Sequence, residues 1–164
     1  MEDPGRAREA EPKASRPQMD GYGVPPVSEG MLPWGWARER LVRSHNYWLT
    51  TARRDGAPHT MPVWGVWVNG AWYCSTGAGS RKGQNLAANP RCVVCNEDAA
   101  EAVIVEGVAR RLPDSEIPPQ VPVDYRAKYG WELEGSVFEV RPRVVFAMPE
   151  KQFPAGVTRW TFGQ

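Results

Sequence analysis

One segment, STGAGSRKGQNLAANP at residues 75–90, has residue types and a spacing that suit anion binding. A glycine-rich bend leads into Ser80, which is a favourable helix N-cap because its hydroxyl can accept a hydrogen bond from a free backbone amide. Pro90 cannot continue a helix. The segment therefore predicts a short helix over residues 80–88 whose first-turn amides lie beside the bend.

Arg81 and Lys82 fall in the first turn of that helix, where the helix dipole already supplies partial positive charge. Two further cations are unfavourable there unless an anion binds beside them. Together with the hydroxyls of Thr76 and Ser80, they would form a phosphate site. On these local features the alternative, in which both cations point into solvent, remains open. The GxxxxGK[ST] pattern of a Walker loop is absent.

Patterns for metal binding and for acid–base or nucleophilic catalysis are missing. Cys92 and Cys95 have CxxC spacing, but RCVVCN predicts an apolar strand, so both are interpreted as core residues and no metal site is predicted. His45 and His59 have neither metal-ligand nor triad spacing, and no catalytic residue is assigned. Such a chain can still be an enzyme if a cofactor carries the chemistry, which favours a flat, phosphate-bearing, flavin-like molecule.

Aromatic residues gather on both sides of an Asn-Gly turn. Trp64 and Trp67 are three residues apart on the strand before the turn, so they are expected to face opposite sides of it. Trp72 and Tyr73 follow the turn. One face of this hairpin is expected to fill the core, and the other is available for a flat ligand or a partner subunit.

The elements that would position these residues are mostly strands. Three short helices are predicted at residues 33–44, 80–88 and 124–129. Period-two patterns and turn signals predict strands at residues 47–53, 59–68, 71–76, 91–96, 102–112, 136–148 and 158–162. Six or so mostly antiparallel strands with a few short helices indicate a mainly β protein built as a barrel.

Composition bounds the remaining possibilities. Residues 1–27 are rich in Pro, Gly and charge and are predicted to be a disordered tail, which leaves residues 28–164 as one domain. The 164 residues carry 20 Lys and Arg against 19 Asp and Glu, so no attraction to nucleic acid or anionic membrane is expected. No apolar run could span a bilayer and the N-terminus lacks the centre of a signal peptide, so a cytoplasmic location is expected.

Three segments occur in an informative order: TTARRDGAPHTMPVWGVWVNGAWYCST, SRKGQNLAANPRCVV and VIVEGVARRL. They resemble the pyridoxamine 5'-phosphate oxidase-like family of flavin-binding split barrels. With the closing GVTRWTF, the chain is most similar to the actinobacterial branch that uses the deazaflavin coenzyme F420. The resemblance covers residues 33–162 and implies a six-stranded antiparallel split β-barrel that forms a homodimer, with two cofactor sites at the subunit interface.

The resemblance also implies which residues bind the cofactor. The family positions that hold the cofactor phosphate correspond here to Thr76, Ser80, Arg81, Lys82 and Asn85. The strand along the ring system corresponds to Met61, Pro62 and Val63, and Trp160 of the partner subunit is implied to cover the ring or substrate pocket. Gln84 stands where many relatives carry a basic residue, which leaves the identity of the cofactor open.

The implied activity is that of an oxidoreductase, in which reduced F420 transfers hydride to a small unsaturated or quinone-like substrate. FMN is the first alternative cofactor, because both molecules share the phosphate anchor. The carboxylate tail of F420 would need further cations, for which Arg53, Arg54 and Arg91 are candidates. A non-catalytic flavin or haem carrier, or a structural dimer, is the second alternative. Tyr73, His59 and solvent all remain open as the proton donor.

Overall fold

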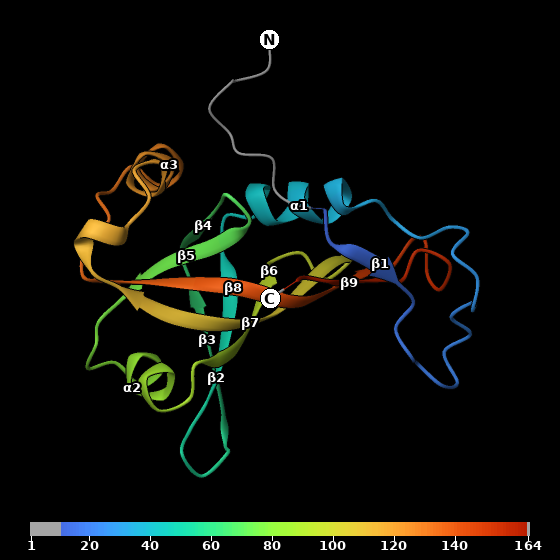
Figure 1. Cartoon of the computed structure of the whole chain (residues 1–164), viewed down its shortest axis with the longest axis horizontal. Helices are drawn as coiled ribbons and strands as arrows, with labels where there is room; N and C mark the ends of the chain where they lie inside the picture. The colour runs from blue at the N-terminus through green and yellow to red at the C-terminus, as the bar shows by residue number, and fades with distance from the viewer. Residues whose placement is uncertain (1–10, 164) are drawn as a thin grey trace.

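In a computed structural model, residues 11–163 are described, and nine strands of this part form one antiparallel sheet against which three helices pack (Figure 1). None of these helices has the length and apolar character needed to cross a membrane. The elements are β1 (Lys13–Ser15), α1 (Trp34–Arg43), β2 (Tyr47–Ala52), β3 (Pro58–Val63), β4 (Gly65–Val68), β5 (Ala71–Thr76), α2 (Arg81–Ala88), β6 (Arg91–Asn96), β7 (Glu101–Leu112), a 3₁₀ turn (Asp114–Glu116), α3 (Gln120–Tyr129), β8 (Ser136–Pro149) and β9 (Thr158–Thr161).

The strand order is β1-β9-β8-β7-β6-β2-β3, while β8 also pairs with β5 and β5 with β4. The sheet curves without closing, because β3 and β4 follow one another in the chain but do not pair. This architecture confirms the predicted mainly β, antiparallel fold and is consistent with a split barrel. The strand count is nine rather than six, partly because the predicted strand 59–68 breaks at Trp64 and forms β3 and β4.

The break is fixed by Gly65, whose backbone lies directly against the buried indole of Trp72. A Cβ at position 65 would lie 2.4 Å from that ring, so only glycine allows so close an approach. The chain can therefore turn a corner between β3 and β4 instead of continuing as one strand.

The core inside the sheet is a row of side chains that are paired in register across five strands. Each member is at most 1% exposed. The row, called the inner row below, consists of Leu49, Val94, Val105, Val145 and Trp160. Helix α1 covers one end of this core with Trp34, Ala37 and Leu41, which belong to the same cluster.

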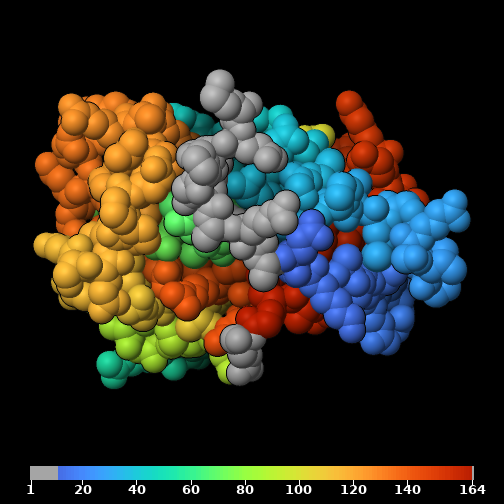
Figure 2. All heavy atoms as spheres, turned by 45° about the horizontal axis from the view of Figure 1, so that its top comes forward, coloured from blue at the N-terminus to red at the C-terminus, as the bar shows by residue number. Residues whose placement is uncertain are grey.

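A second, smaller core lies between α3 and the outer side of β4, β5 and β8. Val121 and Tyr125 of α3 pack there on Val66 and Tyr73. Helix α3 begins at Gln120, four residues earlier than predicted, because Pro122 falls in its first turn, where a missing amide costs no hydrogen bond. The helix and the segment after it lie at the surface, at the left of Figure 2.

Residues 11–27 differ from the predicted disordered tail. Strand β1 pairs with β9 along three residues. The guanidinium of Arg16 donates hydrogen bonds to the carbonyls of Val27 at 2.8 Å and of Ala155 and Val157 at 2.7 Å. These contacts hold the segment on the loop before β9. The first ten residues of the predicted tail lie outside the described residues.

Candidate functional site

The bend at residues 77–79 and the start of α2 form the corner that the sequence singles out. The amide of Gly83 donates to the Ser80 hydroxyl at 3.1 Å, so Ser80 is the N-cap, as predicted. The hydroxyl oxygens of Thr76 and Ser80 lie 3.1 Å apart. A Cβ on Gly83 would lie 2.6 Å from the carbonyl oxygen of Gly77, so the bend packs tightly on the first turn of the helix.

The first turn of α2 contains two cations and no acidic residue. Arg81 is exposed and Lys82 is half-buried, and within the described part of the chain neither side chain forms a hydrogen bond or an ion pair. Burial raises the pKa of the Cys74 thiol to about 12, and the charge of Lys82 opposes that rise. The charge of Lys82 therefore affects a thiol in the core, although no carboxylate of the described residues pairs with it. An anionic ligand bound at this corner would supply the missing counter-ion.

Asn85 is buried and ties α2 to the sheet, because its Nδ2 donates to Thr51 Oγ1 of β2 at 3.0 Å. His59 of β3 stands opposite Thr51 in the strand pairing, and its Nδ1 is buried without a hydrogen-bond partner. Buried polar atoms are nearly always hydrogen-bonded, so a ligand with oxygen atoms in this corner would suit His59. Neither the Thr51 contact nor this orphaned nitrogen could be inferred from the sequence.

The implied ring-binding residues lie along β3, which is an edge strand. Within the described residues β3 pairs only with β2, so the backbone groups on its other edge are free of strand partners. Met61 is 43% exposed and Pro62 is exposed, whereas Val63 is buried. A planar ligand could therefore meet both the free backbone edge and the Met61 side chain.

The implied role of Trp160 does not agree with its position. Trp160 is 1% exposed, pairs with Val145 in the inner row and packs edge-on against Trp34 at 5.5 Å between ring centroids. A side chain so placed cannot cover a ligand bound to another subunit. The structure thus brings together the predicted residues at positions 76–85. Residues 61–63 lie on β3, one strand away from the Asn85–Thr51 contact that ties α2 to β2. Trp160 lies in the core and not at this site.

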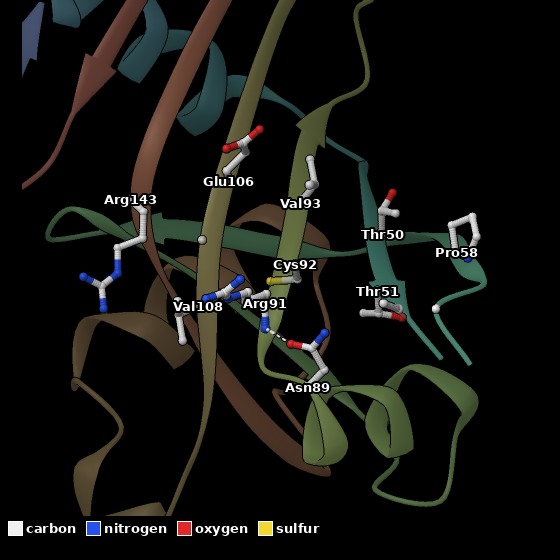
Figure 3. A pocket seen from close by; sticks show the side chains of 13 residues that line it. Thr50, Thr51, Pro58, Asn89, Arg91, Cys92, Val93, Glu106, Val108 and Arg143 are labelled. Carbon is white, nitrogen blue, oxygen red and sulfur yellow. Dashed lines mark hydrogen bonds between the residues drawn. The ribbon is translucent and has the colours of Figure 1, made fainter. Parts of the chain in front are cut away.

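A groove of about 660 Å³ lies on the outer face of the sheet, across β2, β6, β7 and β8 (Figure 3). Three charged side chains line it: Arg91, Arg143 and Glu106. None of the residues implied to bind the cofactor lines this groove. Arg91 was a candidate for binding an anionic tail and does line the groove, whereas Arg53 and Arg54 lie at the turn between β2 and β3.

The same outer face carries an apolar row beside the groove. Two of its side chains are exposed and three are half-buried, although they are mostly large and apolar. The row, called the outer apolar row below, consists of Pro62, Trp48, Cys95, Ile104 and Phe146, each in register with the next. Exposed apolar patches of this extent on a sheet are typical of surfaces that bind a partner.

A network of polar groups holds the corner between β3 and β4 from the side of α3. Lys128 Nζ donates to the Tyr47 hydroxyl at 2.8 Å, to the Gly65 carbonyl at 3.1 Å and to the Val42 carbonyl at 3.5 Å. Burial lowers the pKa of Lys128 to about 8, although the charge of Glu97 opposes this shift. The sequence contained no signal for this contact, because its acceptors are more than 60 residues away.

The comparison with family models finds a match that spans most of the sheet. Residues 37–149 match the family described as pyridoxamine 5'-phosphate oxidase. None of the curated proteins matches the sequence significantly.

Solved structures with the same fold include proteins that bind different cofactors. An F420 reductase is 21% identical with a TM-score of 0.54, over 66% of this chain and 94% of that one. An FAD-binding protein from Mesorhizobium loti is 18% identical with a TM-score of 0.58, over 80% and 96%. The haem storage protein HutZ of Vibrio cholerae is 20% identical with a TM-score of 0.56, over 70% and 90%. At these identities the similarity shows the fold alone.

Proposed function

The chain belongs to the pyridoxamine 5'-phosphate oxidase family, and from this premise we propose that it is an oxidoreductase that uses a flavin-type cofactor. The preferred cofactor is coenzyme F420, and the chain falls in the actinobacterial F420-dependent branch. Its substrate is a small unsaturated or quinone-like molecule. The observation that carries this proposal is that Arg81 and Lys82, at the capped start of α2, have no partner among the described residues, while α2 contacts β2, the strand next to β3.

The residues at this corner fit the phosphate of such a cofactor. The free amides of α2, the hydroxyls of Thr76 and Ser80 and the ammonium of Lys82 supply donors and positive charge, with no acid nearby in the first turn. The backbone edge of β3 would orient the ring. When bound in its reduced form, the cofactor supplies a hydride, so the protein needs to supply orientation and exclusion of water rather than an acid–base constellation.

The structure narrows the choice of proton donor. Tyr73 lies in the second core beneath α3, donates a hydrogen bond to buried Glu139 at 3.0 Å, and has its pKa raised by burial and by that bond. Tyr73 is therefore committed to the protein interior. His59 on β3 and solvent remain as sources of the proton that accompanies the hydride into the acceptor.

FMN is the alternative cofactor, because a site built for phosphate serves both molecules. The proposal draws support for F420 from the F420 reductase of the same fold. The haem storage protein of the same fold keeps a non-catalytic carrier as the second alternative. Small-molecule ligands, a cytoplasmic location and no binding to nucleic acid or membrane complete the proposal.

We also propose that the protein is a homodimer that packs along the outer apolar row and places two cofactor sites at the interface. The row offers a continuous apolar surface across five strands, and its largest member, Trp48, is 47% exposed. Replacing Trp48 with Glu puts a charge within that surface. Light scattering should then show a monomer for Trp48→Glu and a dimer for the wild type. A wild-type monomer that binds cofactor fully would contradict the dimer.

The function is tested by titrating the purified protein with F420 and with FMN and following fluorescence quenching. Lys82→Ala should weaken binding by about 1.5 to 3 kcal/mol, because a charge-assisted bond to phosphate is lost. Lys151→Ala is the matched control, since Lys151 is an exposed lysine in the turn after β8. Oxidation of reduced F420 by a panel of quinones and enones then tests catalysis. Equal affinities for all three proteins, or no oxidation above background, would contradict the proposal.

A further inference from the structure

Trp64, the single residue between β3 and β4, is held at the surface by other aromatic rings. Its indole stacks on the ring of Tyr129, with centroids 4.5 Å apart and planes 8° from parallel. The rings of His45 and Tyr125 approach the indole edge-on, at 6.3 Å and 6.5 Å. The indole nevertheless remains 38% exposed, so part of its surface is available to a ligand. The sequence placed Trp64 and Trp67 on opposite faces, and of the two only Trp64 reaches the surface.

The ring behind Trp64 is fixed by hydrogen bonds to the backbone. The Tyr129 hydroxyl accepts from the Gly65 amide at 2.9 Å and lies within donating distance of the His45 carbonyl, at 2.7 Å, and the Gly65 carbonyl, at 2.8 Å. Burial raises the pKa of Tyr129 to about 12, so the hydroxyl keeps its proton at neutral pH. A rigid aromatic surface loses little conformational entropy when a ligand stacks on it.

Trp64 directly follows residues 61–63, the strand proposed to run along the cofactor ring. Two other exposed apolar side chains lie on the same strand pair, but on opposite faces of the sheet. Met61 on β3, 43% exposed, stands opposite the core residue Leu49, whereas Trp48 of the outer apolar row stands opposite Pro62. Exposed apolar side chains therefore lie on both faces of the strand that leads to Trp64. The indole itself adjoins the end of the strand proposed to run along the cofactor ring, where an acceptor would lie to receive hydride.

The charges near Trp64 select the type of ligand. The ammonium of Lys128 lies 5.4 Å from the centroid of the Tyr129 ring. The negative charge of Glu97 acts on the pKa of both groups, against the lowering by burial at Lys128 and with the raising by burial at Tyr129. The charges of Lys128 and Glu97 therefore offset each other, and neither attracts a charged ligand strongly. Lys128 already has its hydrogen-bond acceptors and is half-buried, so it offers no free cation to an anionic ligand. A neutral, planar molecule gains stacking and apolar contact without needing a charged partner.

We propose that Trp64, backed by Tyr129, is the wall that recognises the acceptor substrate, and that this substrate is a neutral, planar, fused-ring molecule of the naphthoquinone class. This inference rests on the proposed function, because it assigns a substrate class to the same site. Trp64 is a specificity-determining residue in this account and takes no part in the chemistry.

The direct test is ¹⁹F NMR of the protein labelled with 5-fluorotryptophan, with Trp64→Phe used to assign the signal of Trp64. The probe is 2,3-dimethyl-1,4-naphthoquinone, whose substituted ring carbons prevent addition of cysteine thiols. The Trp64 signal should shift on addition of the probe, whereas the signal of Trp131, which is 68% exposed, should not. 2-Decalone, a bicyclic ketone that is not planar, should shift neither signal.

Affinity for the probe provides the second readout, measured by equilibrium dialysis with and without cofactor. Trp64→Leu should weaken binding about tenfold, Trp64→Phe should retain most of it, and Trp131→Leu should change nothing. A Trp64 signal that is unmoved by the probe but shifts when the protein is diluted would show that a partner subunit covers the indole, and would overturn the inference. Equal shifts from the decalone would also overturn it.

The outcomes separate this inference from the proposed function. If F420 or FMN binds in a Lys82-dependent manner while the probe does not shift the Trp64 signal, the proposed function is supported and the role of Trp64 in substrate recognition is contradicted. If the probe shifts the Trp64 signal while neither cofactor binds, the role of Trp64 in binding planar molecules is supported and the proposed function is contradicted.

Discussion

Helices α2 and α3 each bring a lysine to the sheet, and the two lysines have opposite surroundings. Lys82 of α2 has no hydrogen-bond acceptor among the described residues, whereas Lys128 of α3 has three. The two regions also differ in their backbones. The amides of Arg81 and Lys82 at the start of α2 have no acceptor among the described residues, whereas the amide and the carbonyl of Gly65 are both occupied by α3.

The two lysines therefore have different roles: Lys128 stabilises the fold, and Lys82 is available to bind an anionic ligand. A cation whose bonds are complete, like Lys128, stabilises one geometry of its own chain, and its lowered pKa records the burial that this requires. A cation without a partner, like Lys82, contributes little until an anion arrives. Changes near α3 should therefore act on stability, and changes near α2 should act on cofactor affinity.

The largest effect is expected from Gly65→Ala at the α3 corner. The new Cβ would lie 2.4 Å from the fully buried Trp72 ring, which has no room to move. We expect a loss of about 3 kcal/mol in the free energy of unfolding, measured by urea denaturation. Gly79→Ala in the bend before α2 is the control, because a Cβ there would meet nothing within 4 Å. Equal losses for the two variants would contradict the view that position 65, unlike position 79, has no room for a side chain.

A smaller effect is expected from Asn85→Ala, which should change both the stability of the protein and its affinity for the cofactor. The change leaves the buried Thr51 hydroxyl without its donor, so the free energy of unfolding should fall by about 1 to 2 kcal/mol. FMN affinity should fall less than in Lys82→Ala, because Asn85 positions the helix and does not carry charge. Gln84→Ala, which removes only an exposed bond from Gln84 Nε2 to the Gly79 carbonyl at 3.2 Å, should reduce stability less than Asn85→Ala does. An intact Asn85→Ala protein that has lost all FMN binding would show that Asn85 contacts the cofactor.

The smallest effect is the pH dependence that Lys128 confers. Its pKa is about 8 in the folded protein against the usual 10.5, so between these values the unfolded chain binds more protons than the folded one. The contribution of Lys128 to the free energy of unfolding should therefore rise with pH through this window. The rise cannot exceed about 1.4 kcal/mol per pH unit for one proton, and solvent screening reduces it.

To measure this dependence, the free energy of unfolding is determined by urea denaturation at pH 7.5, 8.5 and 9.5 for wild type and Lys128→Met, with reductant present. The difference between the two proteins at each pH gives the contribution of Lys128. The difference removes the opposing contributions of Cys74 and Cys92, whose pKa values burial raises to about 12. A wild-type advantage that stays constant across the three pH values would contradict the account of Lys128.

The sequence predicted those features that depend on neighbouring residues. The cap at Ser80, the end of α2 before Pro90 and the two cations in its first turn follow from interactions within a few residues. The antiparallel strands follow from their alternation and from the Asn69-Gly70 turn, where both residues have positive φ.

The features that the sequence did not reveal depend on contacts between distant parts of the chain. The break at Trp64 depends on the Trp72 ring, and the three-residue β1 depends on pairing with β9. Trp160 was misplaced because a family resemblance gives a residue's place in the order of elements but not the face of the strand on which it lies. The hydrogen bonds of Lys128 and the stacking of Trp64 on Tyr129 were also missed, because both join residues that are far apart in the sequence.

The central claim is that the start of α2 binds a phosphate, and comparison of FMN with riboflavin tests it most directly. The two ligands share the ring system and differ in the phosphate, so the ratio of their dissociation constants isolates that group. In the wild type FMN should bind more tightly by about 1.5 to 3 kcal/mol, and Lys82→Ala should remove most of this preference while leaving riboflavin affinity unchanged. Equal preference for FMN in the wild type and in Lys82→Ala would contradict the claim.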